Sequence, residues 1–315
     1  MTEEGIASAK ARSSVPSART SLGHNLTDLG WLTDTVGLVT SNDVVRDPKF
    51  PIRDLASVAP QLRWIHIIGA GVEPLLPLDW LPRDVILTNN SGVHVEKTRE
   101  SAMMALLMLN ARLPTIATNQ RNRHWDQIFT PLIAGRTALV IGVGDMGTAV
   151  ARAAKELGLR VVGVRRTRGS AHPQVDAMIS VDALDLALPK ADFVILTTPL
   201  TPETRNLLDR RRIALMKTGA GIFNIGRAAC VDHDALAEAL RSGALSGAVL
   251  DVHDPEPLPA SSPLWHIDNL LIIPHVTSDD LDSYLPKTFD LVFSNWARLI
   301  RGEPLLNVVD RVRGY

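Results

Sequence analysis

The chain contains a strand–turn–helix pattern built on three glycines, Gly142-Val143-Gly144-Asp145-Met146-Gly147. A short apolar run, 138–141, precedes it, and an amphipathic run of helical period, about 146–157, follows it. In this setting the first glycine permits a tight turn, the second lets the backbone approach a pyrophosphate, and the third lets the helix pack on the strand. The N–H groups and positive dipole at the helix N-terminus suit phosphates. The pattern predicts a dinucleotide-binding unit whose cofactor contacts are Gly142, Gly144, Asp145, Met146 and Gly147.

Apolar runs and helical periods alternate along most of the remaining chain. Further strands are predicted over 160–164, 178–179, 193–197, 221–225, 248–251 and 270–273, and three earlier ones over 36–40, 64–68 and 85–88. Helices are predicted over 54–61, 96–113, 114–125, 209–216, 232–243 and 286–301. Such alternation is typical of parallel sheets covered on both faces. The first 30 or so residues show no clear period, which predicts a mobile tail.

Composition excludes several classes of protein. Lys+Arg is 33 and Asp+Glu is 34, so no basic excess exists for a nucleic-acid partner. The longest strongly apolar run, 102–109, is far shorter than the roughly 20 residues of a membrane helix, and the acidic N-terminus lacks the apolar core of a signal peptide. Cys230 is the single cysteine, so no internal disulfide can form. We expect a folded protein in a reducing, cytoplasmic location.

Arginines follow the strand predicted over 160–164, which is the second strand of the dinucleotide-binding unit. They lie in the stretch Val164-Arg165-Arg166-Thr167-Arg168. An NAD-binding unit usually places an acidic residue near this position, where it binds the ribose 2′-hydroxyl. Guanidinium groups instead suit a 2′-phosphate. The stretch therefore favours NADP, with NAD possible, and predicts Arg165, Arg166 and Arg168 as cofactor contacts.

Three chemically active side chains follow three later strands. Arg227 closes the stretch Asn224-Ile225-Gly226-Arg227, Glu256 lies in Asp251-Val252-His253-Asp254-Pro255-Glu256-Pro257-Leu258, and His275 follows Pro274. Ligands of open α/β sheets bind at the carboxyl ends of strands. An arginine can hold a carboxylate through two parallel hydrogen bonds, a histidine can exchange a proton, and a glutamate can orient the imidazole. No spacing of Cys, His and carboxylates supports a metal, so His94, His253 and His266 are interpreted as surface or packing residues.

Together these stretches, with Ser262-Pro263-Leu264-Trp265 and the closing Arg-Gly-Tyr, resemble the D-isomer-specific 2-hydroxyacid dehydrogenase family from about Trp64 to Tyr315. The resemblance implies that Arg227 anchors the substrate carboxylate, that Glu256 pairs with His275, and that His275 is the acid/base. It implies that Asp251 contacts the nicotinamide carboxamide. It also implies a carboxylate-binding loop and a loop along the cofactor, which are Ala70-Gly71-Val72 and Thr198-Pro199-Leu200-Thr201 respectively.

The resemblance also implies a fold: an α/β protein of two doubly wound, Rossmann-like parallel-sheet domains. The smaller, flavodoxin-like substrate domain would be discontinuous, 1–95 plus 287–315, and the NAD(P)-binding domain would span 96–286. Dimers would form through the cofactor domains, with helix 102–109 at the interface. The chain departs from the family pattern at Glu73, Ala228 and Thr277-Ser278, which leaves the substrate preference open.

The leading functional hypothesis is a reductase that moves hydride from NADPH to a small 2-oxo acid of the glyoxylate or hydroxypyruvate type. One alternative is a formate or phosphite dehydrogenase, although formate enzymes of this fold carry Gln where this chain has Glu256. The other is a cofactor-sensing corepressor or scaffold on the same fold, which intact Arg227, Glu256 and His275 do not exclude. A small-molecule substrate, with no nucleic acid and no membrane, is the expected partner.

Overall fold

The computed structural model describes residues 3–13, 29–166 and 171–315. It divides into two compact units, Met1–Val93 with Asp280–Tyr315, and His94–Asp279. Both units are parallel-sheet α/β structures, which confirms the predicted fold class. The domain boundaries given above stay predictions.

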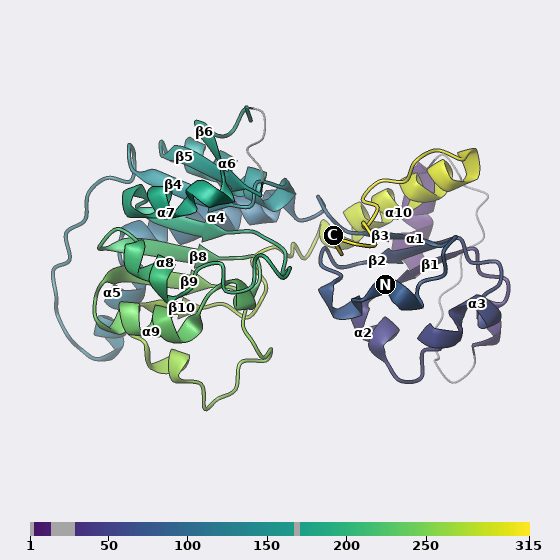
Figure 1. Cartoon of the computed structure of the whole chain (residues 1–315), viewed down its shortest axis with the longest axis horizontal. Coiled ribbons are helices and arrows are strands. Elements are labelled where there is room, and N and C mark those ends of the chain that lie inside the picture. Colours follow the sequence, from purple (N-terminus) through teal and green to yellow (C-terminus); the bar gives the residue numbers. More distant parts are fainter. Residues whose placement is uncertain (1–2, 14–28, 167–170) are drawn as a thin grey trace. The chain divides into compact units, whose positions relative to one another are not determined.

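The larger unit contains a seven-stranded sheet in the order β10-β9-β8-β7-β4-β5-β6 (Figure 1). Every neighbouring pair is parallel. The order reverses between β4 and β7, and this reversal marks the crevice where doubly wound sheets bind ligands. The strands are β4 (Thr137–Ile141), β5 (Arg160–Arg165), β6 (Ala177–Ser180), β7 (Phe193–Leu196), β8 (Ala220–Asn224), β9 (Leu245–Leu250) and β10 (Leu270–Ile272).

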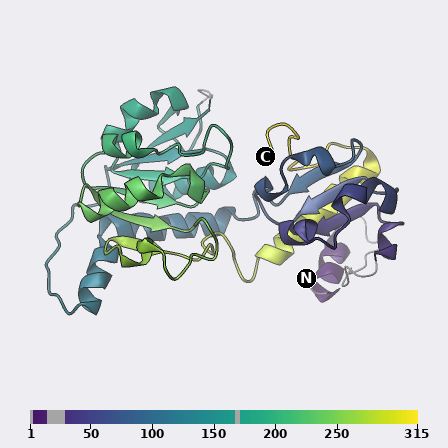
Figure 2. The same ribbon diagram turned by 60° about the horizontal axis from the view of Figure 1, so that its bottom comes forward.

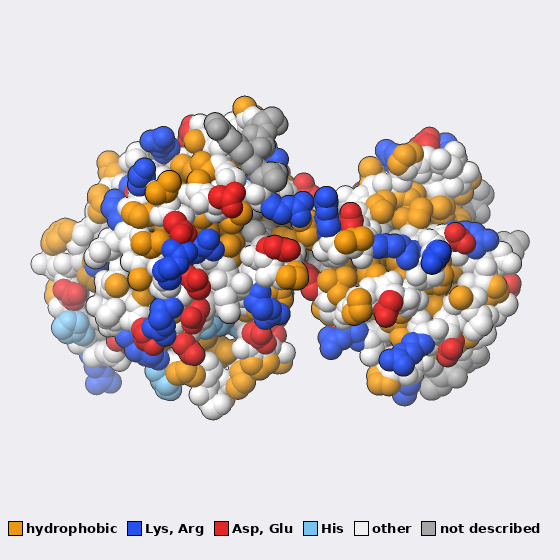
Figure 3. All heavy atoms as spheres, viewed as in Figure 1, with side chains coloured by type: hydrophobic (Ala, Val, Ile, Leu, Met, Phe, Trp, Pro, Cys, Tyr) orange, Lys and Arg blue, Asp and Glu red, His pale blue; other side chains and the backbone are white. Residues whose placement is uncertain are grey.

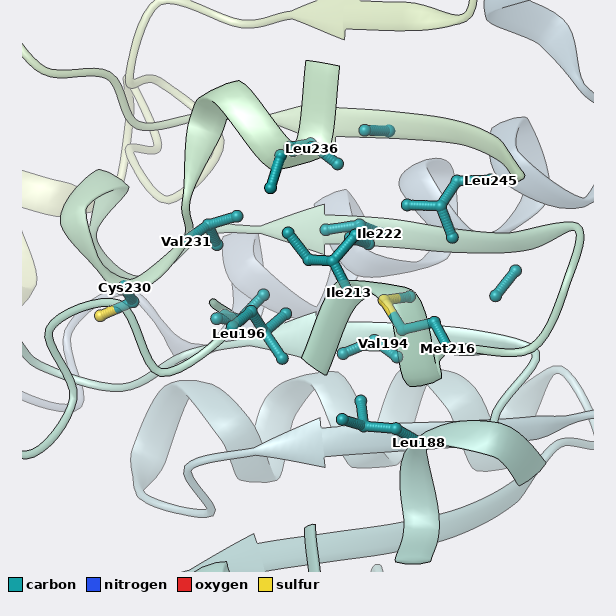
Figure 4. Packing of buried hydrophobic residues seen from close by; sticks show 14 of the residues in the cluster. Leu188, Val194, Leu196, Ile213, Met216, Ile222, Cys230, Val231, Leu236 and Leu245 are labelled. Atoms are coloured by element: carbon teal, nitrogen blue, oxygen red, sulfur yellow. The ribbon is translucent and has the colours of Figure 1, made fainter. Parts of the chain in front are cut away.

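Helices cover both faces of this sheet because its strands are apolar on both sides (Figures 1 and 2). On one face Ala138 and Val140 pack with α4 (Val95–Asn110) and α6 (Asp145–Glu156). On the other, Leu139 and Ile141 belong to a core that includes α8 (Arg210–Leu215) and α9 (His233–Arg241). Figure 4 shows part of this core, with Ile213 of α8 and Leu236 of α9. The remaining helices are α5 (Leu113–Arg121) and α7 (Leu184–Ala187).

The smaller unit is built on a three-stranded parallel sheet in the order β1-β2-β3, within the described residues. Its strands are β1 (Gly37–Thr40), β2 (Trp64–Ile67) and β3 (Ile86–Asn89). Its helices are α1 (Glu3–Arg12), α2 (Asn42–Arg46), α3 (Leu55–Val58) and α10 (Tyr284–Arg301). Because α10 follows the larger unit in sequence, both ends of the chain contribute to this unit.

Two predicted segments differ from the structure. The expected mobile tail contains α1, because Ile6 and Ala9 lie one turn apart and pack on Phe289 and Phe293 of α10. The rest of that tail, 14–28, lies outside the described residues. The helix predicted over 54–61 is the single turn α3, because Pro60 disfavours helical geometry in the residue before it.

Charged side chains of both signs are interspersed on the face that Figure 3 shows, in keeping with the balanced composition. Among the described helices, none is both long and apolar enough to cross a membrane.

Candidate active site

The glycine turn after β4, residues 142–147, has the geometry that a pyrophosphate site requires, and we call it the phosphate turn. Gly142 has φ +95°, and a Cβ at Gly147 would lie 1.8 Å from the carbonyl oxygen of Gly142. Neither position tolerates a side chain. A Cβ at Gly144 would meet nothing within 4 Å, so the backbone there is open to a ligand. Gly144 is also the N-cap of α6, and no side chain caps that helix. The residues therefore fit the phosphates of a dinucleotide.

The loop after β7 lies directly against this turn. The Thr197 hydroxyl donates to the carbonyl oxygen of Gly142, and a Cβ on Gly142 would lie 2.8 Å from Thr198 Cγ2. Thr198 is buried, and the Pro199 carbonyl accepts a 2.7 Å hydrogen bond from the Thr204 hydroxyl. The predicted cofactor loop, Thr198 and Pro199, is thus fixed beside the phosphate turn at the point where the strand order reverses.

The arginines after β5 differ from one another in their surroundings. Arg165 Nε donates to the Val143 carbonyl at 3.0 Å, and Nη2 donates to the same oxygen, so this guanidinium braces the phosphate turn. Arg166 is exposed. The pKa of Glu203 lies below its ordinary value, mainly through a hydrogen bond with Thr201 and partly through the charge of Arg166. Arg168 lies outside the described residues.

A short polar turn presents Arg227 at the carboxyl end of β8. The Asn224 side chain is fully buried, donates to the Arg227 carbonyl at 3.1 Å and accepts from the Gly226 N–H at 3.1 Å. A Cβ at Gly226 would lie 2.8 Å from the Thr198 carbonyl oxygen, so glycine is required for this close approach. The turn therefore fixes the backbone from which Arg227 projects.

Glu256 and His275 form a hydrogen-bonded pair. Glu256 Oε2 lies 2.8 Å from His275 Nδ1, and Oε1 accepts from the His253 N–H at 2.7 Å. Burial raises the pKa of Glu256, but the bonds from His275 and His253 outweigh it and leave that pKa below its ordinary value. The ionised carboxylate makes Nδ1 the donor and leaves Nε2 as the second ring nitrogen for proton exchange. The His275 side chain is 51% exposed, so a substrate can reach it.

Asp251, at the end of β9, holds the backbone that carries His275. Its Oδ1 accepts from the N–H groups of Val276 and Thr277, at 2.9 and 3.2 Å, and its Oδ2 accepts from the Thr277 hydroxyl at 2.6 Å. Burial raises the pKa of Asp251 despite these bonds. His275 has φ +54°, an uncommon conformation for a non-glycine residue, and these bonds hold the segment in place. In the sequence Thr277 is only a departure from the family pattern, and the structure gives it this role.

The structure brings Arg227, Glu256 and His275 to one edge of one sheet, since they follow the adjacent strands β8, β9 and β10. The phosphate turn and the loop at Thr198 lie at the same carboxyl edge. Ala70, Gly71 and Val72 belong to the smaller unit, where they follow β2. Within the described residues, no group of three or more His, Cys, Asp or Glu could hold a metal ion.

A known family model matches most of the larger unit. The model for the NAD-binding domain of D-isomer specific 2-hydroxyacid dehydrogenases matches residues 103–277. A glyoxylate reductase from Korarchaeum cryptofilum is 31% identical over 268 residues, which cover 82% of this chain and 79% of the relative.

Solved structures match the whole chain. A D-isomer specific 2-hydroxyacid dehydrogenase from Xanthobacter autotrophicus, in complex with NADPH and MES, is 32% identical with a TM-score of 0.83, over 100% of this chain and 96% of that one. An NADPH-dependent glyoxylate/hydroxypyruvate reductase from Sinorhizobium meliloti, in complex with NADP and sulfate, is 27% identical with a TM-score of 0.81, over 100% and 97% of the two chains.

Proposed function

Since the chain belongs to the D-isomer specific 2-hydroxyacid dehydrogenase family, we propose that it reduces a small 2-oxo acid of the glyoxylate or hydroxypyruvate type with NADPH. The chain is an oxidoreductase of that family and binds a nicotinamide cofactor. The observation that carries the finer proposal is the Glu256–His275 pair at the same sheet edge as Arg227. These are the groups that a proton transfer beside a bound carboxylate requires.

Each residue has a separate part in the proposed reaction. Arg227 binds the substrate carboxylate and orients the reacting carbon, and it stabilises the negative charge that develops on the carbonyl oxygen. The reduced nicotinamide supplies the hydride when it is bound. His275 donates a proton from Nε2 to that oxygen, which becomes the hydroxyl of the product. Glu256, ionised at neutral pH, holds Nδ1–H and stabilises the imidazolium before the transfer.

The proposal assigns the cofactor to the carboxyl edge of the seven-stranded sheet. The N-terminus of α6 would hold the pyrophosphate, and Asp251 would lie near the carboxamide. Arg165, Arg166 and Arg168 would surround the 2′-phosphate. Two relatives of known structure were solved with NADPH or NADP, which supports this preference. We also propose a reducing, cytoplasmic location, because the single cysteine, Cys230, can form no internal disulfide.

A substrate panel tests the proposed function. We expect NADPH oxidation with glyoxylate or hydroxypyruvate, and none with formate or phosphite when NAD or NADP is the acceptor. Activity only with formate or phosphite would favour a formate or phosphite dehydrogenase. Cofactor binding without turnover of any 2-oxo acid would favour a cofactor-sensing corepressor or scaffold.

Cofactor preference gives a prediction with a matched control. We expect kcat/KM with NADPH to exceed that with NADH by at least about tenfold, equivalent to about 1.4 kcal/mol. Arg166→Asp should remove most of this preference, because it replaces an exposed cation by an anion that repels the 2′-phosphate. Arg160→Ala, at the opposite end of β5, is the control and should leave the preference unchanged. Steady-state kinetics with both cofactors measure the effect.

Arg165 should behave differently from Arg166, because its guanidinium donates twice to the Val143 carbonyl. Arg165→Asp should weaken the binding of NADPH and NADH together as well as the preference between them. Equal use of both cofactors by the unmodified enzyme would contradict the assignment of these arginines.

We also infer a homodimer formed through the cofactor-binding unit. The segment 122–135, between α5 and β4, runs outside the other elements of its unit (Figures 1 and 2). Its side chains Trp125, Phe129 and Leu132 are 90%, 89% and 85% exposed. Apolar side chains of α4 and α5 in the same unit are also partly exposed, namely Met104, Leu107, Leu113 and Ile116. The exposed side chains of segment 122–135 and those of α4 and α5 belong to the same unit. Two copies related by a twofold axis can therefore bury both sets of side chains against each other.

The dimer proposal predicts that the exposed aromatic residues determine association. Each fully buried side chain of this size contributes about 1.5–3 kcal/mol, so the double variant Trp125→Ser with Phe129→Ser should convert the dimer to monomer at micromolar concentration. Light scattering after size exclusion measures the mass. Val312→Ser, which changes a residue that is 96% exposed outside this segment, should leave the dimer intact. A monomeric unmodified protein would contradict the proposal.

A further inference from the structure

Four consecutive carbonyl groups after β2 are tied to polar groups of the smaller unit. The Ile68 carbonyl accepts from Asn90 Nδ2 at 2.9 Å and from the Tyr284 hydroxyl. The Gly69 carbonyl accepts from the Asn90 N–H at 3.1 Å. The Ala70 carbonyl accepts from Asn89 Nδ2 at 2.7 Å, and the Gly71 carbonyl accepts from Asn42 Nδ2 at 2.9 Å. We call the three asparagine side chains, Asn42, Asn89 and Asn90, the carbonyl tethers.

The tethers determine where the N–H groups of this segment point. In a trans peptide the C=O and the following N–H point in opposite directions. The bonds to the carbonyls of Gly69, Ala70 and Gly71, from the Asn90 N–H and from the side chains of Asn89 and Asn42, therefore turn the N–H groups of residues 70, 71 and 72 away from these donors. Those three N–H groups donate to no acceptor within the part of the chain that the structure describes. Gly69, Ala70 and Gly71 are half-buried, so a small anion can reach this backbone.

A buried hydrogen-bond chain fixes the orientation of the Asn90 amide. Trp64 Nε1 donates to the Thr88 hydroxyl at 2.8 Å, and His66 Nδ1 lies 2.9 Å from the same hydroxyl. His66 Nε2 lies 3.1 Å from Asn90 Oδ1, which can only accept, so Nε2 carries the proton and Nδ1 accepts from Thr88. Burial lowers the pKa of His66 to about 4, so the ring is neutral near pH 7. With Oδ1 engaged, Asn90 must turn its NH₂ group to the Ile68 carbonyl.

The C-terminal helix of the same unit secures the other side of the Asn90 amide. Asn90 Nδ2 also donates to the Thr288 hydroxyl at 2.7 Å, and Thr288 in turn donates to the Tyr284 carbonyl at 2.8 Å. Asn90 and Thr288 are fully buried. Asn90 thus belongs to the buried core of the unit.

Resting on the proposed function, we propose that Asn89 and Asn42 are positioning residues whose side chains aim the backbone N–H groups of Gly71 and Val72 at the substrate carboxylate, while Asn90 anchors the start of the same segment. The tethers touch the backbone and not the substrate. They fix the direction of the backbone N–H groups in this segment. Without the tethers, the peptide planes could rotate, because the segment contains Gly69 and Gly71. Oriented backbone N–H groups of this kind bind anions.

Asn42 is the tether best suited to a test. It lies in the first turn of the short surface helix α2, where alanine is a good helix former, so a folded variant is expected. Its Oδ1 is buried with no partner in the described chain, which is costly for an amide. The bond from its Nδ2 to the Gly71 carbonyl is therefore the contact that the substitution removes.

The experiment measures carboxylate binding directly and turnover separately. Oxalate is titrated by calorimetry into the NADPH complex of the full-length protein, and kcat and KM are measured with glyoxylate. We expect Asn42→Ala to weaken oxalate binding and raise KM by about tenfold, with kcat within about twofold, since the loop binds substrate and transition state alike. Asn42→Asp, which replaces the donor by a carboxylate, should weaken binding further. Asp43→Ala, next to it on the exposed side of α2, is the matched control and should change neither value.

The outcomes separate this inference from the proposed function. Oxalate binding that is unchanged in Asn42→Ala and Asn42→Asp overturns the role of the tethers, and so does an unmodified protein that binds no oxalate. Oxalate binding that weakens as expected, in a protein that reduces no 2-oxo acid, supports the tethers and refutes the proposed reaction. A fall in kcat with KM unchanged would also count against positioning of a carboxylate.

Discussion

Replacing His275 by alanine is expected to lower the turnover of 2-oxo acids by about 10²–10⁴-fold, the usual contribution of a general acid. NADPH should still bind, because the phosphate turn and the loop at Thr198 do not depend on the imidazole. Steady-state kinetics measure the turnover, and fluorescence titration of NADPH measures the binding. His266→Ala, an exposed histidine in the same unit, should leave both values unchanged.

The pair with Glu256 adds a pH dependence to the same prediction. The reaction needs protonated His275, so reduction should fall as the pH rises and the imidazolium loses its proton. The pKa of Glu256 lies below its ordinary value, so its carboxylate is charged throughout this range and stabilises the imidazolium. Glu256→Gln removes that charge and should move the fall to lower pH. A profile that does not move, or near-normal turnover in His275→Ala, would remove His275 from its assigned role.

The local structure around the candidate site follows from the sequence where it depends on contacts within one turn or one helix. Gly142 and Gly147 are required by contacts within one turn and its neighbouring strand, so the glycine pattern alone indicates them. The helix predicted over 232–243 corresponds to α9, and the Asp232 side chain at its start accepts from the Ala235 N–H at 2.9 Å. Arg227, Glu256 and His275 each follow a recognisable apolar strand, and parallel strands bring their carboxyl ends to one edge.

The parts that the sequence did not predict depend on partners far apart in the chain. The sequence carries no signal for the roles of Asn42, Asn89 and Asn90, because the carbonyls that their side chains bind lie 19 to 29 residues away. Thr277 differs from many family members, but only the position of Asp251 explains it, since the two lie 26 residues apart. Arg165 also donates to the Val143 carbonyl of the phosphate turn, a contact that the arginine-rich stretch alone does not indicate. Periodicity reports which face of an element is buried and not which distant polar group it meets.

Arg227 carries the second large expected effect. A charge-assisted hydrogen bond to a carboxylate contributes about 1.5–3 kcal/mol, so Arg227→Gln should raise KM for 2-oxo acids by roughly 10- to 150-fold. Turnover should fall as well, because the same guanidinium stabilises the charge on the reacting oxygen. The polar turn at Asn224 fixes the backbone of residue 227, so the fold should tolerate the change. Arg205→Gln, an exposed arginine of the same unit, is the control and should have normal kinetics.

The Arg227→Lys variant tests why an arginine is needed. Lysine keeps the positive charge but lacks the planar group that meets both oxygens of a carboxylate in one orientation. We therefore expect Lys to restore part of the lost binding and little of the lost turnover, because turnover depends on the angle at which the reacting carbon is held. Full restoration of both by Lys would show that charge alone matters at this position. Orientation of the substrate would then have to come from the backbone N–H groups that Asn42 and Asn89 position.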